Sequence, residues 1–587
     1  MLEFDRRKCI RSLLFSMPPA LILSISFALG GSMQEFGAVD LRSASLWLSI
    51  VGLLVLFETV LFILFGFGSE AIALQKGDLS SRSKKTASGI GRFASRFVNG
   101  GKKRVFLFAF IIFVCWIPYY LIAFPGLYTY DAVHQTQWAI VQGTVSSFHP
   151  LIHTYWLSGL MVFGKAVLGS YEAGVALYSV SQMALVSLGF SWIVCFVAKR
   201  FKNALAPILV LTYFALFPLH PLLALSTTKD IVFSVSFVIF VCLVFDLIKS
   251  PEMFLKSRLN WFGFVGICFL ASAFRNNGLY AVLITLVAVV VMVRVCRKKT
   301  TLLVALSMIA CLSYSFVFVP AVADSGSTKS EMLGVPIQQL SRLASSDSID
   351  EETRSSIEHY IPSYELYSPA ITDPVKFRGD LSNIDGDMVG FLELWLREGV
   401  EHPGVYLDAF VALTYGFWDP AADYYDINTT KPYLEYQGWT YYPDGHAERL
   451  MAPDGYKEIL SVDDPCEWIF IESSNFFPRL SDVLEGICLD PPWTHWGIVS
   501  ILISPGMLLQ YVIIAFCYCL CRTRYNNAFA FAVVLLYFAT CLLGPCFLIR
   551  YAYPLFVFAP LIPVLCGRDK SRRLPQPSID CVDVRHL

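Results

Sequence analysis

Long apolar runs recur along this chain and constrain its fold more than any other feature. A helix needs roughly 20 predominantly apolar residues to cross a membrane, and twelve runs approach that length. They lie near residues 12–30, 46–68, 105–123, 173–198, 204–224, 231–248, 260–274, 278–296, 301–320, 498–520, 527–548 and 551–566. Only 16% of the residues are charged, too few for a soluble protein of this size. We therefore expect an all-α polytopic membrane protein with about twelve transmembrane helices.

Two apolar segments need separate comment. The helix near 151–169 begins with polar residues, so we expect it to lie in the interface or to enter the membrane partway. The run near 12–30 follows basic residues, as a signal peptide does. It lacks a small-residue cleavage site and a second span follows closely, so we expect a retained signal-anchor.

Basic residues fall on every second connection between the twelve spans. The clusters lie at 6–11, 84–104, 199–202, 256–258, 297–299, 522–524 and 568–573. Short loops rich in Lys and Arg stay in the cytoplasm. We therefore expect a multi-pass protein of the cell membrane with both termini cytoplasmic.

One long stretch has the opposite charge. Residues 321–495 hold 31 acidic and 10 basic residues, a net charge of −21, while the remainder holds 15 and 35, a net charge of +20. The stretch is long enough for a domain, and its many Trp and Tyr residues favour a packed fold over a disordered tail. We expect an extracytoplasmic α or α+β domain there. The predicted organisation is 1–104 (two helices and a basic cytoplasmic loop), 105–320 (the core, with a first outer loop at 124–172), 321–495, 496–567 (C-terminal helices) and 568–587 (a cytoplasmic tail).

Cysteines give little functional information. Most of the sixteen lie in apolar runs, where a thiol packs as a small hydrophobe. Cys466 and Cys488 are the two in the acidic stretch, and an oxidising exterior leaves a disulfide between them open. No CxxC or HExxH pattern is present, so no metal site is predicted.

Ionisable residues collect in the connections predicted to face outward. Such residues at membrane depth are costly, so they are functional candidates by default. Three cations at one membrane face suit an anionic ligand, and arginine binds phosphate through two parallel hydrogen bonds. We expect a lipid phosphate to bind there. The candidate residues are Lys229, Asp230, Arg275, Asn276, Asn277, Arg550 and Tyr551.

The first outer loop supplies a carboxylate and several histidines. Thr129 or Asp131 caps a short helix that Gly143 ends, and Pro150 starts another helix between His149 and His153. A carboxylate beside cations can take a proton from an acceptor hydroxyl. The catalytic candidates are Asp131, His149 and His153, with Tyr130, His134 and Gln135 on the acceptor side. The alternatives stay open: Asp131 as a helix cap, the histidines as packing residues, Lys229 as a snorkelling side chain with Asp230 as its partner, and Asn276–Asn277 as a turn.

The pattern resembles the GT-C superfamily of multi-spanning glycosyltransferases, and in particular uncharacterised bacterial members of it. The resemblance covers about residues 105–566. It is carried by Tyr130-Asp131 with Gln135, His149-Pro150, Lys229-Asp230, Arg275-Asn276-Asn277-Gly278, "VPIQQLSR" at 335–342, "DPVK" at 373–376, "HPGVYLDAF" at 402–410, and Arg550-Tyr551 before Pro554.

The resemblance implies an inverting transfer of a sugar from a polyprenyl-phosphate donor to an envelope glycan, lipid or protein. Asp131 would be the base, with Lys229, Arg275 and Arg550 near the donor phosphate. Metal-using members carry paired acids in the first loop, but Asp131 stands alone there. Asp385-Gly386-Asp387 is the nearest such pair, and we interpret it as a turn. We expect no cofactor and a metal-independent reaction.

Other functions remain possible. A transporter or flippase of an anionic or lipid-linked substrate fits twelve spans with both ends inside, although no repeat between halves is evident and the polar motifs avoid the midplane. A glycan ligase or polymerase would use similar outward arginines. The acidic domain could also bind cationic envelope partners. Membrane lipids are expected partners, and nucleic acid is not.

Overall fold

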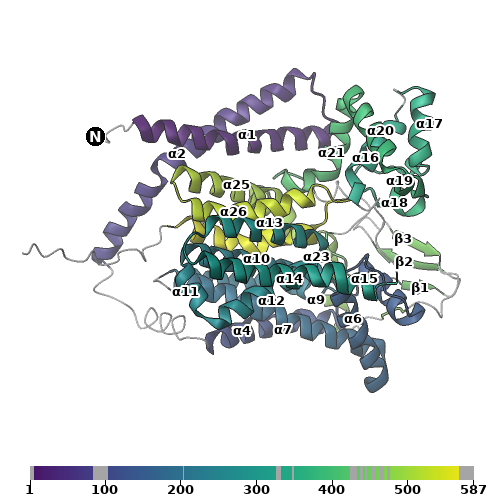
Figure 1. Ribbon diagram of the computed structural model, residues 1–587, viewed down its shortest axis with the longest axis horizontal. Helices are drawn as coiled ribbons and strands as arrows, with labels where there is room; N and C mark the ends of the chain where they lie inside the picture. Colours follow the sequence, from purple (N-terminus) through teal and green to yellow (C-terminus); the bar gives the residue numbers. More distant parts are fainter. Residues whose placement is uncertain are drawn as a thin grey trace, which may run out of the picture.

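The computed structural model describes residues 6–82, 103–201, 204–324, 332–346, 349–423, 433–436, 440–442, 446–450, 457–461, 469–471 and 476–567. This part of the chain is mostly helical. Long helices run side by side in a bundle, and a group of shorter helices and a small sheet lie beyond one of its ends (Figure 1). We refer to that end as the site end of the bundle.

Several helices are long and apolar enough to span a membrane, as the sequence predicts. Among the described residues, eight helices meet the length and composition criteria for a membrane span, or nine if a bent pair is counted as one span. Seven of the eight coincide with predicted runs; the eighth, Leu151–Leu168, is the segment predicted to be interfacial, but it meets the same criterion. The bent pair Leu205–Leu216 and Leu219–Leu225 turns by 52°. Four further apolar helices are shorter, so the structure supports a helical membrane protein without establishing twelve spans.

The first two helices form a hairpin, α1 (Arg6–Phe36) and α2 (Ala44–Arg82). α1 packs against α2, and also against α21 (Pro403–Trp418) and α25 (Pro505–Cys521). Gln510 of α25 donates a hydrogen bond to Ser26 of α1 at 3.0 Å. The hairpin is therefore joined to the bundle by polar as well as apolar contacts.

Helix α10 (Asp230–Lys249) is the centre of the bundle, because almost all of its residues are buried. It packs against α7, α12, α26 (Tyr525–Cys541) and α27 (Ile549–Phe558). Helices α12 and α13 pack closely because residue 278 is a glycine. A Cβ there would lie 2.2 Å from the carbonyl oxygen of Ala271. The helices of this region are α4 (Lys103–Ile122), α5 (Tyr130–Thr136), α6 (Leu151–Phe163), α7 (Tyr171–Ala198), α8 (Leu205–Leu216), α9 (Leu219–Leu225), α11 (Pro251–Lys256), α12 (Arg258–Ala273), α13 (Asn276–Met292), α14 (Arg297–Ser313) and α15 (Val319–Val322), with π-turns η1 (Gln137–Gln142), η2 (Gly164–Leu168) and η3 (Tyr314–Phe318).

Helices α16 to α21 form a unit with a core of its own. Ile337, Leu340, Ile357, Val375 and Phe391 are fully buried in this core. The stretch predicted to be a turn is a junction of two helices: Asp385 and Gly386 end α19, and the Asp387 carboxylate caps the next helix by accepting from the backbone N–H of Gly390 at 3.0 Å. The elements before α21 are α16 (Gly334–Ala344), α17 (Glu351–Tyr360), η5 (Tyr364–Leu366), α18 (Asp373–Arg378), α19 (Ser382–Gly386) and α20 (Met388–Glu401).

A three-stranded antiparallel sheet follows this unit. Strand β2 (His446–Leu450) lies between β1 (Thr440–Tyr442) and β3 (Lys457–Ser461), with Tyr442 opposite His446 and His446 opposite Ser461. Cys488 is a buried free thiol, and Cys466 lies outside the described residues. The remaining elements are α23 (Pro478–Leu489), η7 (Pro492–His495), α24 (Ile498–Ile503), α26 (Tyr525–Cys541), α27 (Ile549–Phe558), η8 (Ala559–Leu561) and α28 (Ile562–Cys566).

Candidate functional site

Two extended segments bring the first candidate residues together. Residues 127–129 and 226–228 run parallel: the backbone N–H of Leu127 donates to the carbonyl of Leu225 at 3.0 Å, and that of Thr227 donates to the carbonyl of Leu127 at 2.9 Å. Each segment leads directly into a helix, α5 or α10. Asp131 and Lys229 therefore emerge side by side although 98 positions separate them.

Asp131 lies between two cations. Its Oδ2 accepts a hydrogen bond from Nζ of Lys229 at 2.7 Å and lies 3.1 Å from Nη1 of Arg550. Burial opposes ionisation of Asp131, but the charges on Arg550, Lys229 and His149 outweigh it and hold the carboxyl pKa well below its usual range. The side chain does not cap its helix: the N-cap residue is Thr129. Asp131 is therefore an ionised group whose partners come from other parts of the fold.

His149 completes the contacts of Lys229. Its Nδ1 lies 3.0 Å from the Lys229 Nζ. Burial and then the Lys229 charge lower the His149 pKa well below its usual range, so the imidazole is neutral at pH 7 and accepts this hydrogen bond. Lys229 is thereby directed by two acceptors.

A second carboxylate, Asp230, is shared by both arginines. Nη1 of Arg275 hydrogen-bonds to its Oδ1, and Nε of Arg550 lies 3.6 Å from its Oδ2. The Arg275 guanidinium also lies 4.0 Å from the ring centroid of Tyr551, a cation–π distance. Asp230 is fully buried, and buried carboxylates are stable only when paired.

Five charged side chains thus form one group, which we call the paired-charge cluster: Asp131, Lys229, Asp230, Arg275 and Arg550. Three cations and two carboxylates leave these five side chains with one surplus positive charge, which the Glu435 carboxylate, outside the cluster, faces at Arg550. Nε and Nη1 of Arg550 are buried and have no hydrogen-bond partner among the described residues. The contact of Nη1 with Asp131 is close enough for an ion pair but lacks hydrogen-bond geometry. Unmet guanidinium donors beside a surplus charge can bind an oxyanion.

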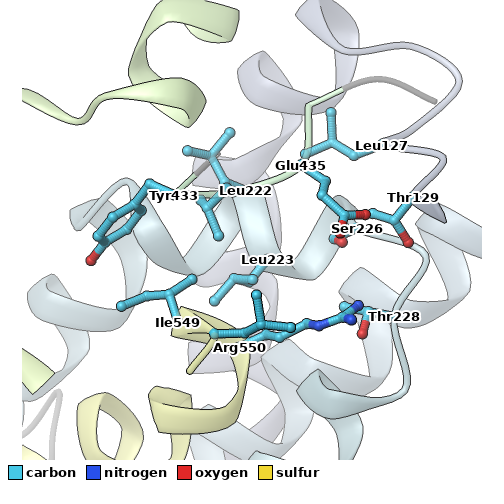
Figure 2. Close-up of a pocket in the computed structure, with 12 residues that line it drawn as sticks. Leu127, Thr129, Leu222, Leu223, Ser226, Thr228, Tyr433, Glu435, Ile549 and Arg550 are labelled. Atoms are coloured by element: carbon cyan, nitrogen blue, oxygen red, sulfur yellow. The ribbon is translucent and has the colours of Figure 1, made fainter. Parts of the chain in front are cut away.

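A cavity borders the cluster (Figure 2). The cavity is small: the empty space between its walls is about 410 Å³ including open solvent, and about 30 Å³ can hold the centre of a water molecule. Leu222, Leu223 and Ile549 form an apolar wall, and Figure 2 shows the Arg550 guanidinium beside Thr228 and the Glu435 carboxylate beside Ser226. The cavity therefore offers an apolar surface next to polar groups.

His153 belongs to an adjoining network. Its ring nitrogens bond Gln135 Oε1 at 2.7 Å and the Tyr178 hydroxyl at 2.8 Å. The Tyr178 hydroxyl donates to Gln182, whose amide donates to the carbonyl of Ser226 at 2.6 Å. His153 and Gln135 therefore support the segment that precedes Lys229 and have no direct bond to Asp131.

The remaining predicted site residues lie at the margin. Asn276 is exposed and Asn277 is half-buried, and both belong to the first turn of helix α13. Neither makes a side-chain hydrogen bond with the described residues. His134 is half-buried, with its ring 6.1 Å from that of Trp138. The side chain of Tyr130 lies outside the described part of the structure.

Sequence reasoning missed the other polar residues of the cavity: Thr129, Ser226, Thr228, Tyr433 and Glu435. The hydroxyl residues shortly before Asp131 and Lys229 could have been predicted, because neighbours of a site residue in the chain also lie near it in space. No comparable sequence signal points to Glu435. It is one of 31 acids in its stretch.

The model of one family matches residues 137–580, and its description is "Family of unknown function (DUF6020)". This region contains every predicted site residue from His149 onward, including Lys229, Arg275 and Arg550, and it begins six positions after Asp131. No curated protein and no solved structure matches the chain.

Proposed function

The chain belongs to this family of unknown function, DUF6020, and we propose that it is a glycosyltransferase of the cell membrane. It would move a sugar from a polyprenyl-phosphate donor to an envelope glycan, lipid or protein on the outer face. The observation that carries the proposal is Asp131 held between Lys229 and Arg550, because Arg550 also lines a cavity with an apolar wall. Donor phosphate, donor lipid and acceptor proton each have a complementary group there.

The donor phosphate would bind at Arg550 and Lys229. Both cations are held by Asp131, so a phosphate would compete with that carboxylate for them. Glu435, which lines the same cavity, would have to move away from the phosphate or hold the acceptor. The leucines of α9 would contact the polyprenyl chain.

The chemical step would then follow from this competition. Asp131 is a weak base while two cations hold its pKa low, and losing part of their charge to the phosphate raises its basicity. Asp131 takes the proton of the acceptor hydroxyl as the oxygen bonds to the anomeric carbon. The bond from that carbon to the phosphate oxygen breaks, and the phosphate leaves with the electron pair, stabilised by Lys229 and Arg550. Attack opposite the phosphate inverts the anomeric centre.

The substitution Asp131→Asn tests this role. Asn removes the base but fits the same space, so the variant should fold and still bind donor. Transfer should fall by about 10²-fold or more. The assay incubates purified full-length protein with polyprenyl-phosphate sugars and an envelope extract, and it measures released polyprenyl phosphate. Near-normal transfer by the variant would remove Asp131 from the mechanism.

A lipid flippase is the second candidate, because one observation favours it. Helices α8 and α9 form a bent pair, and Leu222 and Leu223 of α9 line the cavity. Discontinuous helices commonly form transporter binding sites. In proteoliposomes, a flippase would move labelled donor between leaflets without transferring the sugar, and a glycosyltransferase would transfer it.

The proposed orientation has its own test. Residues 321–495 would lie outside the cell with both termini in the cytoplasm. In a background without native cysteines, Ser382→Cys, near Asp385, should react with an impermeant maleimide in intact cells. Lys256→Cys, in a predicted cytoplasmic loop, should react only after permeabilisation. The reverse pattern would put the site on the cytoplasmic face and exclude an outer-face transfer.

A further inference from the structure

A second group of potential ligands lies at the end of α20, in the α16–α21 unit. One ligand atom from each of Glu398, Glu401 and His402 lies within 4.8 Å of the others. Their spacing of three and four positions places them on one face of a helix. The three residues therefore converge without any change in the backbone.

Glu398 provides an independent sign that a ligand is missing. Only 1% of the residue is exposed, and its buried Oε2 has no hydrogen-bond partner among the described residues. Its other oxygen accepts from Nε of Arg397 at 2.9 Å. Nε2 of His402 lies 3.8 Å from the unpartnered oxygen, too far for a hydrogen bond. A buried carboxylate oxygen without a partner is costly, and a cation between these two atoms would satisfy it.

The types of ligand select the kind of cation. Calcium and magnesium prefer sites made entirely of oxygen, whereas an imidazole nitrogen beside carboxylates suits zinc and neighbouring transition metals. We propose that Glu398, Glu401 and His402 form a binding site for a divalent transition metal ion, with Zn²⁺ the best match. Three protein ligands leave a fourth position for water.

The site lies where two helices join. The backbone N–H of His402 donates to the carbonyl of Glu398 at 2.8 Å, and that of Tyr406 donates to the carbonyl of His402 at 3.2 Å. A bound ion would fix the last turn of α20 against the first residues of α21. Because α21 also packs against α1 and α25, the ion would stiffen the connection between the α16–α21 unit and the bundle. This role is independent of the sugar transfer proposed above.

Metal titration of the full-length protein tests the site. Tag-free protein in detergent is stripped with a chelator and then titrated with Zn²⁺ by calorimetry and with Co²⁺ by visible absorption. One equivalent should bind, and Co²⁺ should show the d–d bands of a site with nitrogen and oxygen ligands. Glu401→Gln and His402→Ala should each weaken binding by about 10-fold or more. Glu401 is exposed, so its loss should leave the fold intact.

Two matched controls separate this site from surface binding. Glu393→Gln removes an exposed acid of the same helix, and His495→Ala removes an exposed histidine beside Asp490. Both should bind Zn²⁺ as the unsubstituted protein does. The proposal is wrong if no saturable binding occurs, or if Glu401→Gln and His402→Ala bind as tightly as the controls.

Discussion

At its start, α10 presents Lys229 and Asp230 to charges from α5, α13 and α27, whereas near its end Asp246 pairs with one arginine, Arg200. Arg200 is satisfied locally: it also donates to the carbonyl of Phe196 at 2.9 Å and lies 3.3 Å from the centroid of that ring. Arg550, at the site end, has two donors without hydrogen-bond partners among the described residues. The same residue types therefore serve two purposes. A locally satisfied pair needs no ligand, and a shared group with surplus charge and open donors can bind one.

The largest expected effect comes from removing the acid at each end of α10. Asp230→Asn should lower the stability by about 3–5 kcal/mol, because two buried arginines lose a shared carboxylate. Asp246→Asn should cost about 1 kcal/mol or less, since Asp246 and Arg200 are partly exposed. Thermal unfolding in detergent measures both. Equal losses of stability in the two variants would show that Asp230 is no more dependent on buried charge pairing than Asp246.

A buried acid with no cation sharpens the comparison. Asp419, after α21, is fully buried and accepts from Nε2 of Gln34 at 3.0 Å, and it forms no ion pair among the described residues. Burial raises the pKa of Asp419 to about 7, whereas two cations lower that of Asp131. The pKa values of these two buried acids thus shift in opposite directions because Asp131 has cationic partners and Asp419 has only neutral ones among the described residues.

The sign of the pH dependence at Asp419 follows from this shift. An unfolded Asp titrates near about 3.9, so between about pH 4 and 7 the folded protein holds a proton that the unfolded chain has lost. The free energy of unfolding should therefore fall as pH rises through this window, by up to roughly 4 kcal/mol. Asp419→Asn should remove this fall, and Asp482→Asn, at an exposed acid, should keep it. Parallel curves for the unsubstituted protein and the Asp419→Asn variant between pH 4 and 8 would contradict the assignment.

The smallest effect concerns ligand binding. Arg550→Gln leaves Asp131 with Lys229 and Asp230 with Arg275, two neutral pairs, so the variant should fold. It should bind polyprenyl phosphate more weakly by about 1.5–3 kcal/mol, the range for a hydrogen bond to a charged group. Arg200→Gln should bind it normally. Equal binding by both variants would show that the surplus charge has no role in recognition.

The sequence predicts the members of the paired-charge cluster because four of them stand at the end of an apolar run and Asp131 lies in the first outer loop, where ionisable residues are conspicuous. It does not predict how they pair. Adjacency in the chain suggests Lys229 as the partner of Asp230, but Asp230 contacts Arg275 and Arg550, 45 and 320 positions away. Such pairing depends on how the helices pack, which local patterns do not encode. The hydroxyls and Glu435 of the cavity were missed for the same reason.

The membrane helices show a similar division. Hydropathy locates the apolar segments, because it depends on composition within a window. It gives the short α12 correctly, but it does not locate the bend between α8 and α9 and it overestimates the lengths of α13, α25 and α26. The bend lies at Pro218, which precedes α9 and has no backbone N–H to continue α8. The count of twelve spans from hydropathy therefore stays a prediction.

The distribution of the paired-charge cluster along the chain has a consequence for biosynthesis. Asp131, Lys229, Asp230 and Arg275 are all translated within the first half of the protein, and they suffice for two neutral pairs. The membrane can therefore receive α5, α10 and α13 without an isolated charge. Arg550 arrives 275 residues later, with one of the last helices, and only then does the cluster gain its surplus charge. A ribosome that stops before α27 would release a chain whose four cluster charges are balanced and which lacks Arg550, the arginine of the proposed anion site.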